Sequence, residues 1–450
     1  MKTDNSPARG MRDLLPADTA VRDHVLSSIT TVYKRYGYQR IETPALEDIA
    51  RLSSGEGGDN EKLIFEVLKR GLPPEVEPGT KIRDLVDLGL RYDLTVPLTR
   101  FYGANQAKLP VPFRSLQVGP VWRAERPQKG RYRQFYQCDI DMIGEPTVLA
   151  EAELIEATSE ALAAVGLDNV TVRISDRRFL SALAAASGVP AELRDGFFIT
   201  LDKLDKIGWE GVRAELASNG LTAETITKAA DTITSLRDQP GSKVGDALTN
   251  AIPGIPDELV ADLSSTAAAL DRLSARRQVS WQFDPTLVRG MGYYTGHIFE
   301  VARPDVSFSL AGGGRYDKLI GRWLGRDVPA VGFSIGFERI VDLLETQARR
   351  NAVAVLAEAD VAPADVLAIA RDLRDGGPGR DGGPGQEASP GQETGPGREA
   401  GHEVVEVVKR SGKFGAQLKR LESAGFTAFV HVQSQEGQVV RGDLRPLGDE

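Results

Sequence analysis

Apolar residues recur at three- and four-residue intervals in several stretches of the chain, which predicts amphipathic helices. The first such stretch runs from Asp18 to Gly37, where a glycine is suited to end a helix. A second, Ala-rich helix is expected over 151–165, and the chain from 179 to 277 follows the helical period almost throughout. We interpret 179–277 as a helical insertion, because strand-type sequence resumes directly after it.

Alternation between apolar and polar residues marks 113–144, FRSLQVGPVWRAERPQKGRYRQFYQCDIDMIG. This period predicts two antiparallel strands that turn one face to a core and the other to solvent. The loop between them carries five cations, Arg123, Arg126, Lys129, Arg131 and Arg133. Such a loop can bind a phosphate-rich ligand through charge-assisted hydrogen bonds. An exposed basic hairpin is the plainer interpretation.

Two shorter stretches predict further strands. The stretch 38–46 is interrupted at Pro44, which favours a sheet edge or an interface. The stretch 90–100, LRYDLTVPLTR, places Asp93 inside a strand, where a carboxylate needs a cation or a donor. Asp93 therefore marks a candidate site, and a structural ion pair with Arg91 or Arg114 is the alternative.

The C-terminal part of the strand-rich sequence contains two more candidates. Three consecutive glycines, 312–314, indicate backbone that approaches a ligand or another chain closely. Residues 330–336 predict a strand that runs into a helix from Phe337. Arg339 would then lie in a helix's first turn, where the dipole disfavours a cation unless an anion is bound. A surface arginine is the alternative.

The segment 376–401 repeats Gly-Pro-Gly with charged spacers and has no large apolar residue, which predicts disorder. Strand-like and helix-like stretches on both sides of it resemble halves of one small α/β domain. The predicted domains are a core formed by 1–178 and 278–348, the insertion 179–277, and a C-terminal domain 349–450 interrupted by this linker.

Composition narrows the class of protein. A chain of 450 residues with 41% apolar and 26% charged residues indicates several globular domains. No apolar run is long enough for a membrane span or a signal core, so a cytoplasmic location is expected. One cysteine, Cys138, and four scattered histidines argue against a transition-metal site. The net charge of −9 means that nucleic acid could bind only through local patches.

Seven motifs in a fixed order resemble those of the histidyl-tRNA synthetases, a family of class II aminoacyl-tRNA synthetases: RGMRDLLP, YGYQRIETP, LRYDLTVPLTR, WRAERPQKGRYRQFYQCDIDMIG, LVRGMGYYTG, AGGGRYD and VGFSIGFERI. The resemblance covers 9–344, with a weaker trace beyond. It implies an α+β fold, in which an antiparallel class II sheet of six or seven strands is flanked by helices. A helical insertion and a small α/β C-terminal domain similar to anticodon-binding domains complete it. A homodimer that uses Pro44 and the first helix is also implied.

The resemblance implies that the protein ligates L-histidine to tRNA(His). ATP and Mg²⁺ would serve the formation of histidyl-adenylate, and the tRNA's terminal adenosine would then take the histidyl group. Arg289 would bridge the substrate carboxylate and the α-phosphate as an electrophilic catalyst. Arg123 would hold the α-phosphate, Arg339 the γ-phosphate, and Glu125 and Arg131 the other phosphates and the base.

The family's histidine-binding positions are also present. Asp93 and Gln137 would take the α-ammonium group, with Thr95 nearby. The remaining positions are those of the imidazole pocket, Asp141, Tyr293, Tyr294 and Tyr316.

Two departures from the family pattern leave alternatives open. Gly292 stands where the family usually has an aspartate, and the Gly/Pro-rich segment interrupts the C-terminal domain. A paralogue that activates histidine without normal tRNA selection is therefore one alternative. A non-catalytic regulatory paralogue that senses histidine is another, although Arg123, Arg289 and Arg339 are all present and argue against it.

Overall fold

The computed structural model describes residues 5–53, 62–127, 131–237, 239–277, 279–289, 292–344, 352–375 and 404–448. The chain forms two compact units, Met1–Glu345 and Thr346–Glu450. Within the described ranges, no helix combines the length and the apolar character needed to cross a membrane.

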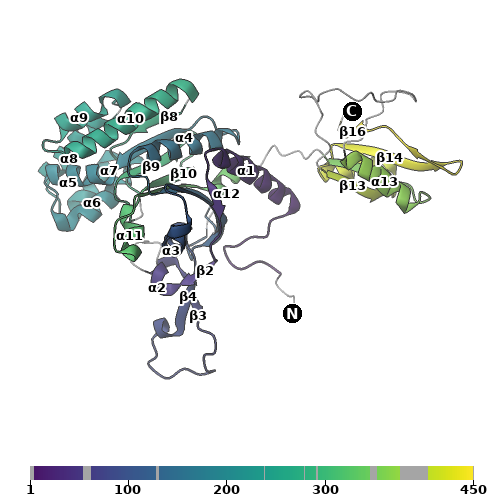
Figure 1. Cartoon of the computed structure of the whole chain (residues 1–450), viewed down its shortest axis with the longest axis horizontal. Helices are drawn as coiled ribbons and strands as arrows, with labels where there is room; N and C mark the ends of the chain where they lie inside the picture. Colours follow the sequence, from purple (N-terminus) through teal and green to yellow (C-terminus); the bar gives the residue numbers. More distant parts are fainter. Residues whose placement is uncertain are drawn as a thin grey trace. The chain divides into compact units, whose positions relative to one another are not determined.

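The main sheet of the first unit has eight strands in the order β1-β5-β6-β11-β10-β9-β7-β8 (Figure 1). Their bounds are β1 Gln39–Ile41, β5 Phe113–Trp122, β6 Gln134–Ile143, β11 Ala330–Ile335, β10 Ala311–Arg315, β9 His297–Ala302, β7 Thr171–Asp176 and β8 Ser280–Phe283. Neighbours are antiparallel except at the edges, where β1 pairs parallel with β5 and β8 with β7. The predicted fold class is confirmed, but six or seven strands was too low a number, because a short parallel strand joins each edge.

Strands β5 and β6 form the hairpin that the alternation predicts, with Phe113 opposite Ile143 and Trp122 opposite Gln134. The apolar face of β6 contributes Cys138 and Ile140 to the largest core. The prediction that the polar face is turned to solvent is wrong. Asp139 and Asp141 on that face are buried and line a cavity instead, as described below.

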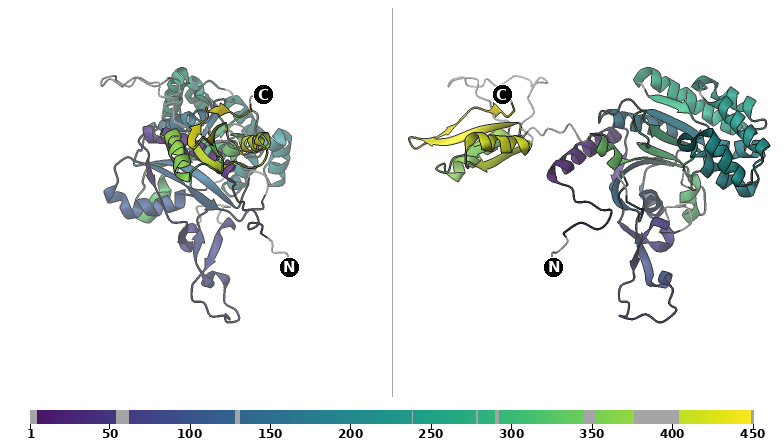
Figure 2. Two further views of the ribbon diagram at one scale, coloured as in Figure 1. Left: turned by 90° about the vertical axis from the view of Figure 1, so that its right-hand side faces the viewer. Right: turned by 180° about the vertical axis from the view of Figure 1, so that it is seen from behind.

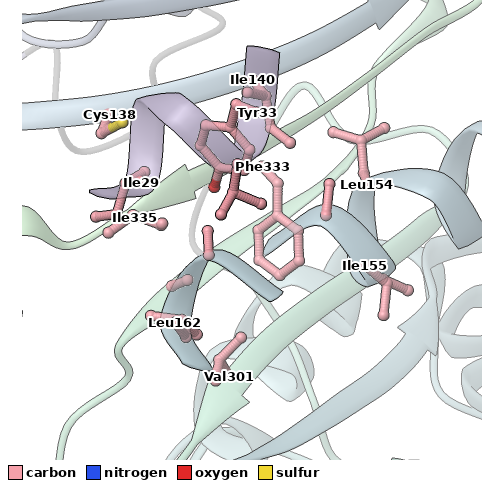
Figure 3. Packing of buried hydrophobic residues seen from close by; sticks show 14 of the residues in the cluster. Ile29, Tyr33, Cys138, Ile140, Leu154, Ile155, Leu162, Val301, Phe333 and Ile335 are labelled. Carbon is pink, nitrogen blue, oxygen red and sulfur yellow. The ribbon is translucent and has the colours of Figure 1, made fainter. Parts of the chain in front are cut away.

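Helices α1 (Pro16–Arg35) and α4 (Leu149–Ala163) pack on the apolar face of the main sheet (Figure 3). Ile29 and Tyr33 of α1 share one core with Leu154 of α4 and with Phe333 of β11. Each such side chain stabilises the fold by about 1.5–3 kcal/mol when fully buried. Helix α12 (Phe337–Leu344) joins this core, and its start follows β11 as predicted.

A three-stranded sheet projects from the first unit as an arm, in the order β2-β4-β3 (Figure 1). It comprises β2 Leu46–Asp48, β3 Phe65–Leu68 and β4 Val86–Leu90, and the short helix α2 Ile49–Leu52 follows β2. The predicted strand over 90–100 is wrong, because helix α3 (Thr95–Asn105) occupies most of it. Asp93 Oδ1 accepts a hydrogen bond from the backbone N of Val96 at 3.1 Å, and this bond favours a helix start. Helix α11 (Asp317–Leu324) shares a smaller core with α3.

The chain between β7 and β8 is helical, as the period predicts. Its helices are α5 Arg177–Ser187, α6 Arg194–Leu201, α7 Leu204–Ser218, α8 Ala223–Leu236, α9 Val244–Ala251 and α10 Asp257–Arg277. They share a core of their own and gather beside one end of the main sheet (Figures 1 and 2). Gly208 interrupts α7 with a backbone φ of 65°, a conformation that glycine adopts at little cost. The turn before Gly208 brings Asp205 and Lys206 to the cavity of the first unit.

The second unit is a five-stranded sheet with two helices. Its elements are β12 Ala352–Ala357, α13 Pro363–Arg374, β13 Val404–Lys409, α14 Phe414–Ser423, β14 Ala428–Gln435, β15 Gln438–Arg441 and β16 Arg445–Pro446. Strands β13 and β14 both pair parallel with β12, so the stretches before and after 376–401 do form one α/β sheet. The predicted linker 376–401 lies outside the described residues.

Candidate active site

One large cavity of about 990 Å³ lies in the first unit. Strands β6, β9, β10 and β11 line it, together with the start of α12 and the turn that begins α7. All of the site residues predicted from the sequence line this single cavity: Asp93, Thr95, Arg123, Glu125, Arg131, Gln137, Asp141, Arg289, Tyr293, Tyr294, Tyr316 and Arg339. They come from segments that are far apart in the chain, so the fold is what brings them together.

Four arginines form the cationic part of the cavity. The Nε of Arg123 donates to the backbone O of Tyr92 at 3.0 Å, and its guanidinium lies 5.1 Å from the ring centroid of Phe135. Arg131 forms an ion pair with Glu125 at 3.3 Å. Carboxylates line the cavity as well, but the planar fork of a guanidinium matches phosphate as well as carboxylate, so four such groups around one cavity suit a polyanion such as a nucleotide's phosphates.

Arg339 lies in the first turn of α12, as the sequence predicts. Its Nη1 donates to the backbone O of Ser309 at 2.7 Å. Burial lowers the pKa of the Arg339 guanidinium, and the positive charges of Arg131 and Arg289 lower it further. A lowered pKa means that the arginine's charge is poorly compensated here, and a bound anion would correct this.

Arg289 forms an ion pair with Glu300 on β9, with 2.7 Å between Nη1 and Oε2. Its Nε is buried without a hydrogen-bond partner among the described residues. The guanidinium lies over Gly312, where an added Cβ would be 2.4 Å from Nη2. The first glycine of the run 312–314 is therefore explained by an arginine of the same chain that must approach the strand closely.

Gly313 and Gly314 have a different reason for being glycine. A Cβ at Gly313 would be 2.0 Å from the backbone O of Gly332, and one at Gly314 would be 2.6 Å from the backbone O of His297. Both contacts are with neighbouring strands of the same sheet. At these two positions the glycines serve the packing of β10 between β9 and β11.

Carboxyl and amide groups form another part of the cavity lining. Burial raises the pKa of Asp93 to about 6, and Asp93 Oδ2 has no hydrogen-bond partner among the described residues. Arg114 instead pairs with Glu153, and Arg91 donates to backbone oxygens, so within the described part of the chain neither arginine forms an ion pair with Asp93. The alternative interpretation of Asp93 as an ion-pair partner is wrong.

Gln137 is held from one side. Its Nε2 donates to Ser334 Oγ at 3.0 Å and approaches the carboxyl of Asp139 at 3.3 Å. Its Oε1 is buried without a partner among the described residues. Burial raises the pKa of Asp139 well above its usual range, and the nearby Asp141 adds to this. The free Gln137 oxygen and Asp93 Oδ2 can both accept hydrogen bonds from an ammonium group.

Three tyrosines and Asp141 close the cavity beside this group. The hydroxyl of Tyr316 donates to Asp141 Oδ1 at 2.6 Å, while Asp141 Oδ2 has no partner within the described part of the chain. Burial raises the pKa of Asp141 to about 7. The rings of Tyr293 and Tyr294 meet edge to face, with centroids 4.9 Å apart. This wall is apolar in body and carries hydroxyl and carboxyl groups, which suits a flat ring that has its own donor and acceptor.

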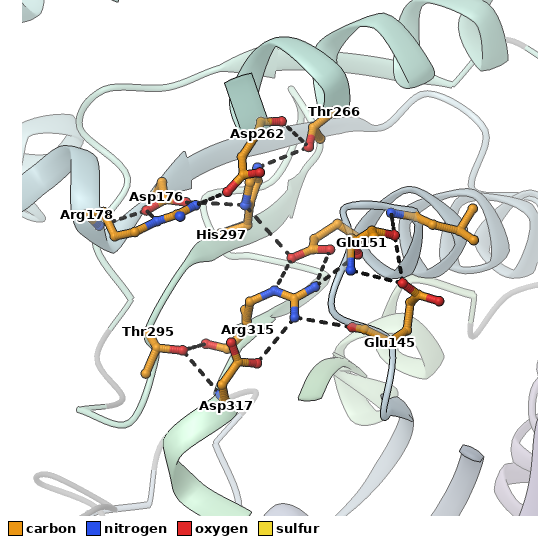
Figure 4. A network of polar contacts seen from close by, with 12 residues as sticks. Glu145, Glu151, Asp176, Arg178, Asp262, Thr266, Thr295, His297, Arg315 and Asp317 are labelled. Carbon is orange, nitrogen blue, oxygen red and sulfur yellow. Dashed lines mark hydrogen bonds and ion pairs between the residues drawn. The ribbon is translucent and has the colours of Figure 1, made fainter. Parts of the chain in front are cut away.

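A buried polar network lies behind the tyrosines (Figure 4). Arg315 donates from Nε and Nη2 to the two carboxylate oxygens of Glu151, at 2.6 and 2.7 Å. His297 is close by, with its Nδ1 3.2 Å from Asp176 and its Nε2 3.1 Å from Thr266. Arg315 directly precedes Tyr316, so the network fixes the backbone from which that tyrosine enters the cavity.

Five acidic residues that line the cavity did not appear in the sequence prediction, and three of them lie in the main sheet or in α12. Asp139 and Glu300 line the cavity, and Glu338 binds Arg22 of α1 through both carboxylate oxygens, at 2.5 and 2.9 Å. Glu338 also accepts from the backbone N of Tyr136 at 3.1 Å, so it joins α12, α1 and β6. The signals were the Glu-Arg pair inside the motif VGFSIGFERI and the Phe-Glu pair in β9, which follows the motif LVRGMGYYTG.

Comparison with known proteins identifies the family. A family profile described as histidyl-tRNA synthetase matches residues 10–340. A histidine--tRNA ligase from Leifsonia xyli subsp. xyli (strain CTCB07) is 45% identical over 98% of this chain and 98% of its own length. A probable histidine--tRNA ligase from Tropheryma whipplei (strain Twist) is 43% identical, over 75% of this chain and 80% of its own.

Solved structures share the fold. A histidyl-tRNA synthetase from Nostoc sp. PCC 7120 aligns with a TM-score of 0.76 at 24% identity, over 98% of this chain and 97% of that one. A protein from Bacillus halodurans C, described as an ATP phosphoribosyltransferase regulatory subunit/histidyl-tRNA synthetase, aligns with a TM-score of 0.73 at 21% identity. This alignment covers 96% of this chain and 99% of that one. Identities this low speak for the fold alone. The profile match and the 45% identity over nearly the full length go further, and they show that the chain belongs to the histidyl-tRNA synthetase family.

Proposed function

We propose that the protein ligates L-histidine to tRNA(His) in two steps, ATP-dependent formation of histidyl-adenylate and transfer to the tRNA's terminal adenosine. Membership of the family makes it an aminoacyl-tRNA synthetase that uses ATP. The observation that carries the proposal for this cavity is its division into two parts. Four arginines face one part, and unpartnered carboxyl and amide oxygens beside three tyrosines face the other. A zwitterionic amino acid and a nucleotide fit these two parts side by side.

The histidine would bind in the acidic and aromatic part. Asp93 and Gln137 would accept hydrogen bonds from its α-ammonium group, with Thr95 at the start of α3 beside them. Asp141 and the tyrosines would read the imidazole, which is both a donor and an acceptor. A pocket that pairs both ring nitrogens rejects isosteres that lack them, because its own buried polar groups would then stay unpaired.

The nucleotide would bind in the cationic part. Arg123 would hold the α-phosphate and Arg339 the γ-phosphate, while Glu125 and Arg131 would contact the remaining phosphates and the base. In the first step a histidine carboxylate oxygen attacks the α-phosphorus, and the bond to the leaving pyrophosphate breaks. Charge builds on the phosphorus oxygens, and preorganised cations offset it. Arg289 would contact both reactants, because its charge acts both on Tyr294 beside the proposed histidine site and on Arg339 beside the proposed nucleotide site.

Mg²⁺ would enter with ATP. The described residues contain no cluster of three or more His, Cys, Asp or Glu side chains that could hold a metal. This suits Mg²⁺, which binds ATP sites through one or two carboxylates, water and the phosphates themselves. Glu125 lines the cavity beside Arg131 and would supply such a carboxylate. When bound, the ion would neutralise part of the phosphate charge.

We also propose that the protein is a homodimer and that its second unit is an α/β domain similar to anticodon-binding domains. Leu15, just before α1, and Leu46, just after Pro44, are exposed apolar residues, which supports a contact between copies there. Exposed Arg126 in the hairpin loop would meet the acceptor end of the tRNA by charge.

The test is histidine-dependent exchange between ATP and pyrophosphate, measured beside two variants. Arg289→Ala should lower kcat by about 10²–10³-fold, since it removes a donor that faces the developing charge. Arg303→Ala, which breaks an exposed ion pair with Asp305 outside the cavity, should leave the exchange unchanged. A second step adds transcribed tRNA(His) and measures charging. A folded protein that gives no exchange with histidine would overturn the ligase proposal and favour the regulatory alternative.

A further inference from the structure

Arg289 has little that fixes its own position. Among the described residues, the Arg289 guanidinium forms one hydrogen bond, to Glu300, and its Nε has no partner. An arginine side chain has many rotamers, so a guanidinium that must bridge two reactants needs a partner that selects one of them. Glu300 is that partner, and the contact of its other carboxylate oxygen fixes the position of Glu300 itself.

Glu300 lies directly opposite Arg173 in the antiparallel pairing of β9 with β7. Its Oε1 is 3.8 Å from Arg173 Nη1, while its Oε2 binds Arg289. One carboxylate therefore stands between two arginines, and both of them line the cavity. Arg173 also pairs with the buried Asp284, which anchors it to the loop after β8.

Arg173 has a further partner from the helical insertion. Asp205, in the turn that begins α7, lies 2.9 Å from Arg173 Nη2. Its side chain is 58% exposed, whereas that of Arg173 is 17% exposed. Arg173 and Asp205 line both the large cavity and a second cavity of about 420 Å³. Of these ion pairs, the one between Asp205 and Arg173 is therefore reached by solvent. A displacement of the insertion would break it.

We infer that Asp205, Arg173 and Glu300 form a chain of ion pairs through which the helical insertion sets the position of Arg289. Glu300 and Asp205 are then positioning residues for adenylate formation. The inference rests on the proposed function, because it assigns them a role through Arg289. Asp205 lies in the first turn of α7, and Gly208 breaks the helix after this turn. The turn can therefore shift without moving the rest of α7. The insertion, which carries none of the motifs, thereby gains a role in the first chemical step.

The experiment compares Glu300→Gln, Asp205→Asn and the double variant in histidine-dependent exchange. Glu300→Gln keeps an acceptor for Arg289 and removes the charge that binds Arg173. It should lower kcat by about 10–100-fold, as expected when a reacting group is misplaced, with the KM for ATP within about twofold. Asp205→Asn should lower kcat by about 3–10-fold, because it loosens the outer pair alone. The double variant should be no slower than Glu300→Gln, since both changes act through one chain of contacts.

The matched control is Glu215→Gln in the same helix α7. Glu215 pairs with Lys203 at 2.6 Å, but it does not line either cavity. This variant should exchange at the wild-type rate. If Glu300→Gln fails to fold, the exchange rate of Asp205→Asn still tests the inference. The Asp205 side chain is mostly exposed, so this variant should fold.

Three outcomes would overturn the inference. The first is an Asp205→Asn rate equal to that of Glu215→Gln. The second is a double variant whose loss is the product of the single losses, which means independent effects. The third is a kcat unchanged in Glu300→Gln. Absence of exchange in the wild-type protein is a different result, and it would overturn the proposed function first.

Discussion

The first unit buries two groups of charged side chains that differ in how completely their polar atoms are paired. In the network around Arg315, both carboxylate oxygens of Glu151 accept from the guanidinium, and both ring nitrogens of His297 have partners (Figure 4). In the cavity, oxygens of Asp93 and Asp141 are buried without a partner among the described residues. The two groups are neighbours, since Arg315 belongs to one and Tyr316 to the other.

The difference indicates what each group is for. A buried polar atom without a hydrogen bond costs about 1–3 kcal/mol, so a complete network favours one structure and an incomplete one awaits a ligand. The unpaired oxygens of one part of the cavity and the poorly compensated charge of Arg339 in another are complementary to a substrate that carries both charges. Changes in the network should therefore reduce stability, and changes in the cavity should reduce activity.

The largest effect should come from Arg315→Ala. It leaves the buried carboxylate of Glu151 without its cation, and removing one partner of a buried ion pair costs about 3–5 kcal/mol. Urea unfolding measures the loss. Arg303→Ala, in an exposed ion pair, should cost no more than about 1 kcal/mol. Equal stability of the two variants would show that the network does not hold the fold.

Asp141→Asn, in contrast to Arg315→Ala, should reduce activity and leave stability nearly unchanged. The asparagine can still accept from Tyr316, but it loses the charge and one acceptor that face the proposed imidazole site. We expect kcat/KM for histidine to fall about 100-fold, close to 3 kcal/mol, with a change in unfolding free energy below about 1 kcal/mol. Steady-state exchange and urea unfolding on one preparation test both halves. A variant that is unstable yet fully active would contradict the comparison.

The pH dependence of stability separates the two groups without mutation. Burial raises the pKa of Asp93 to about 6 and that of Asp141 to about 7. Between pH 4 and pH 7 the folded state therefore binds more protons at these carboxyls than the unfolded state. The free energy of unfolding of the ligand-free protein should then fall as pH rises through this window. The slope should be smaller in Asp141→Asn, and an unchanged slope there would show that other groups cause it.

The sequence predicted the parts of this arrangement that depend on local pattern. Alternation gave β5 and β6, and the strand-to-helix change at 330–337 placed Arg339 at a helix start. It misjudged 90–100, because the hydrogen bond from Val96 to Asp93 that begins α3 outweighs strand propensity there.

Long-range partners were beyond local pattern. The pairing of Glu300 with both Arg289 and Arg173 depends on the register of β9 against β7, which no short stretch specifies. The same holds for the polar face of β6. Its alternation predicted exposure to solvent, but other strands of the sheet and the insertion enclose this face in the structure. The resemblance to a family supplied candidate residues, and the fold supplied the contacts between them.

The smallest effect should come from Cys138→Ala, which uses the other face of β6 as a reference. Cys138 lies between Gln137 and Asp139 in the chain, but its side chain is buried in the main core, where burial raises the pKa of the thiol. Loss of the sulfur should cost about 1 kcal/mol of unfolding free energy and leave exchange kinetics within about twofold. Urea unfolding and exchange of the variant beside Asp141→Asn check this. Cys138 would then control stability, whereas Gln137 and Asp139 beside it line the cavity that controls activity. The alternation of side chains along β6 causes this difference. A loss of activity in Cys138→Ala as large as in Asp141→Asn would mean that core packing, and not the unpaired oxygens, sets the geometry of the cavity.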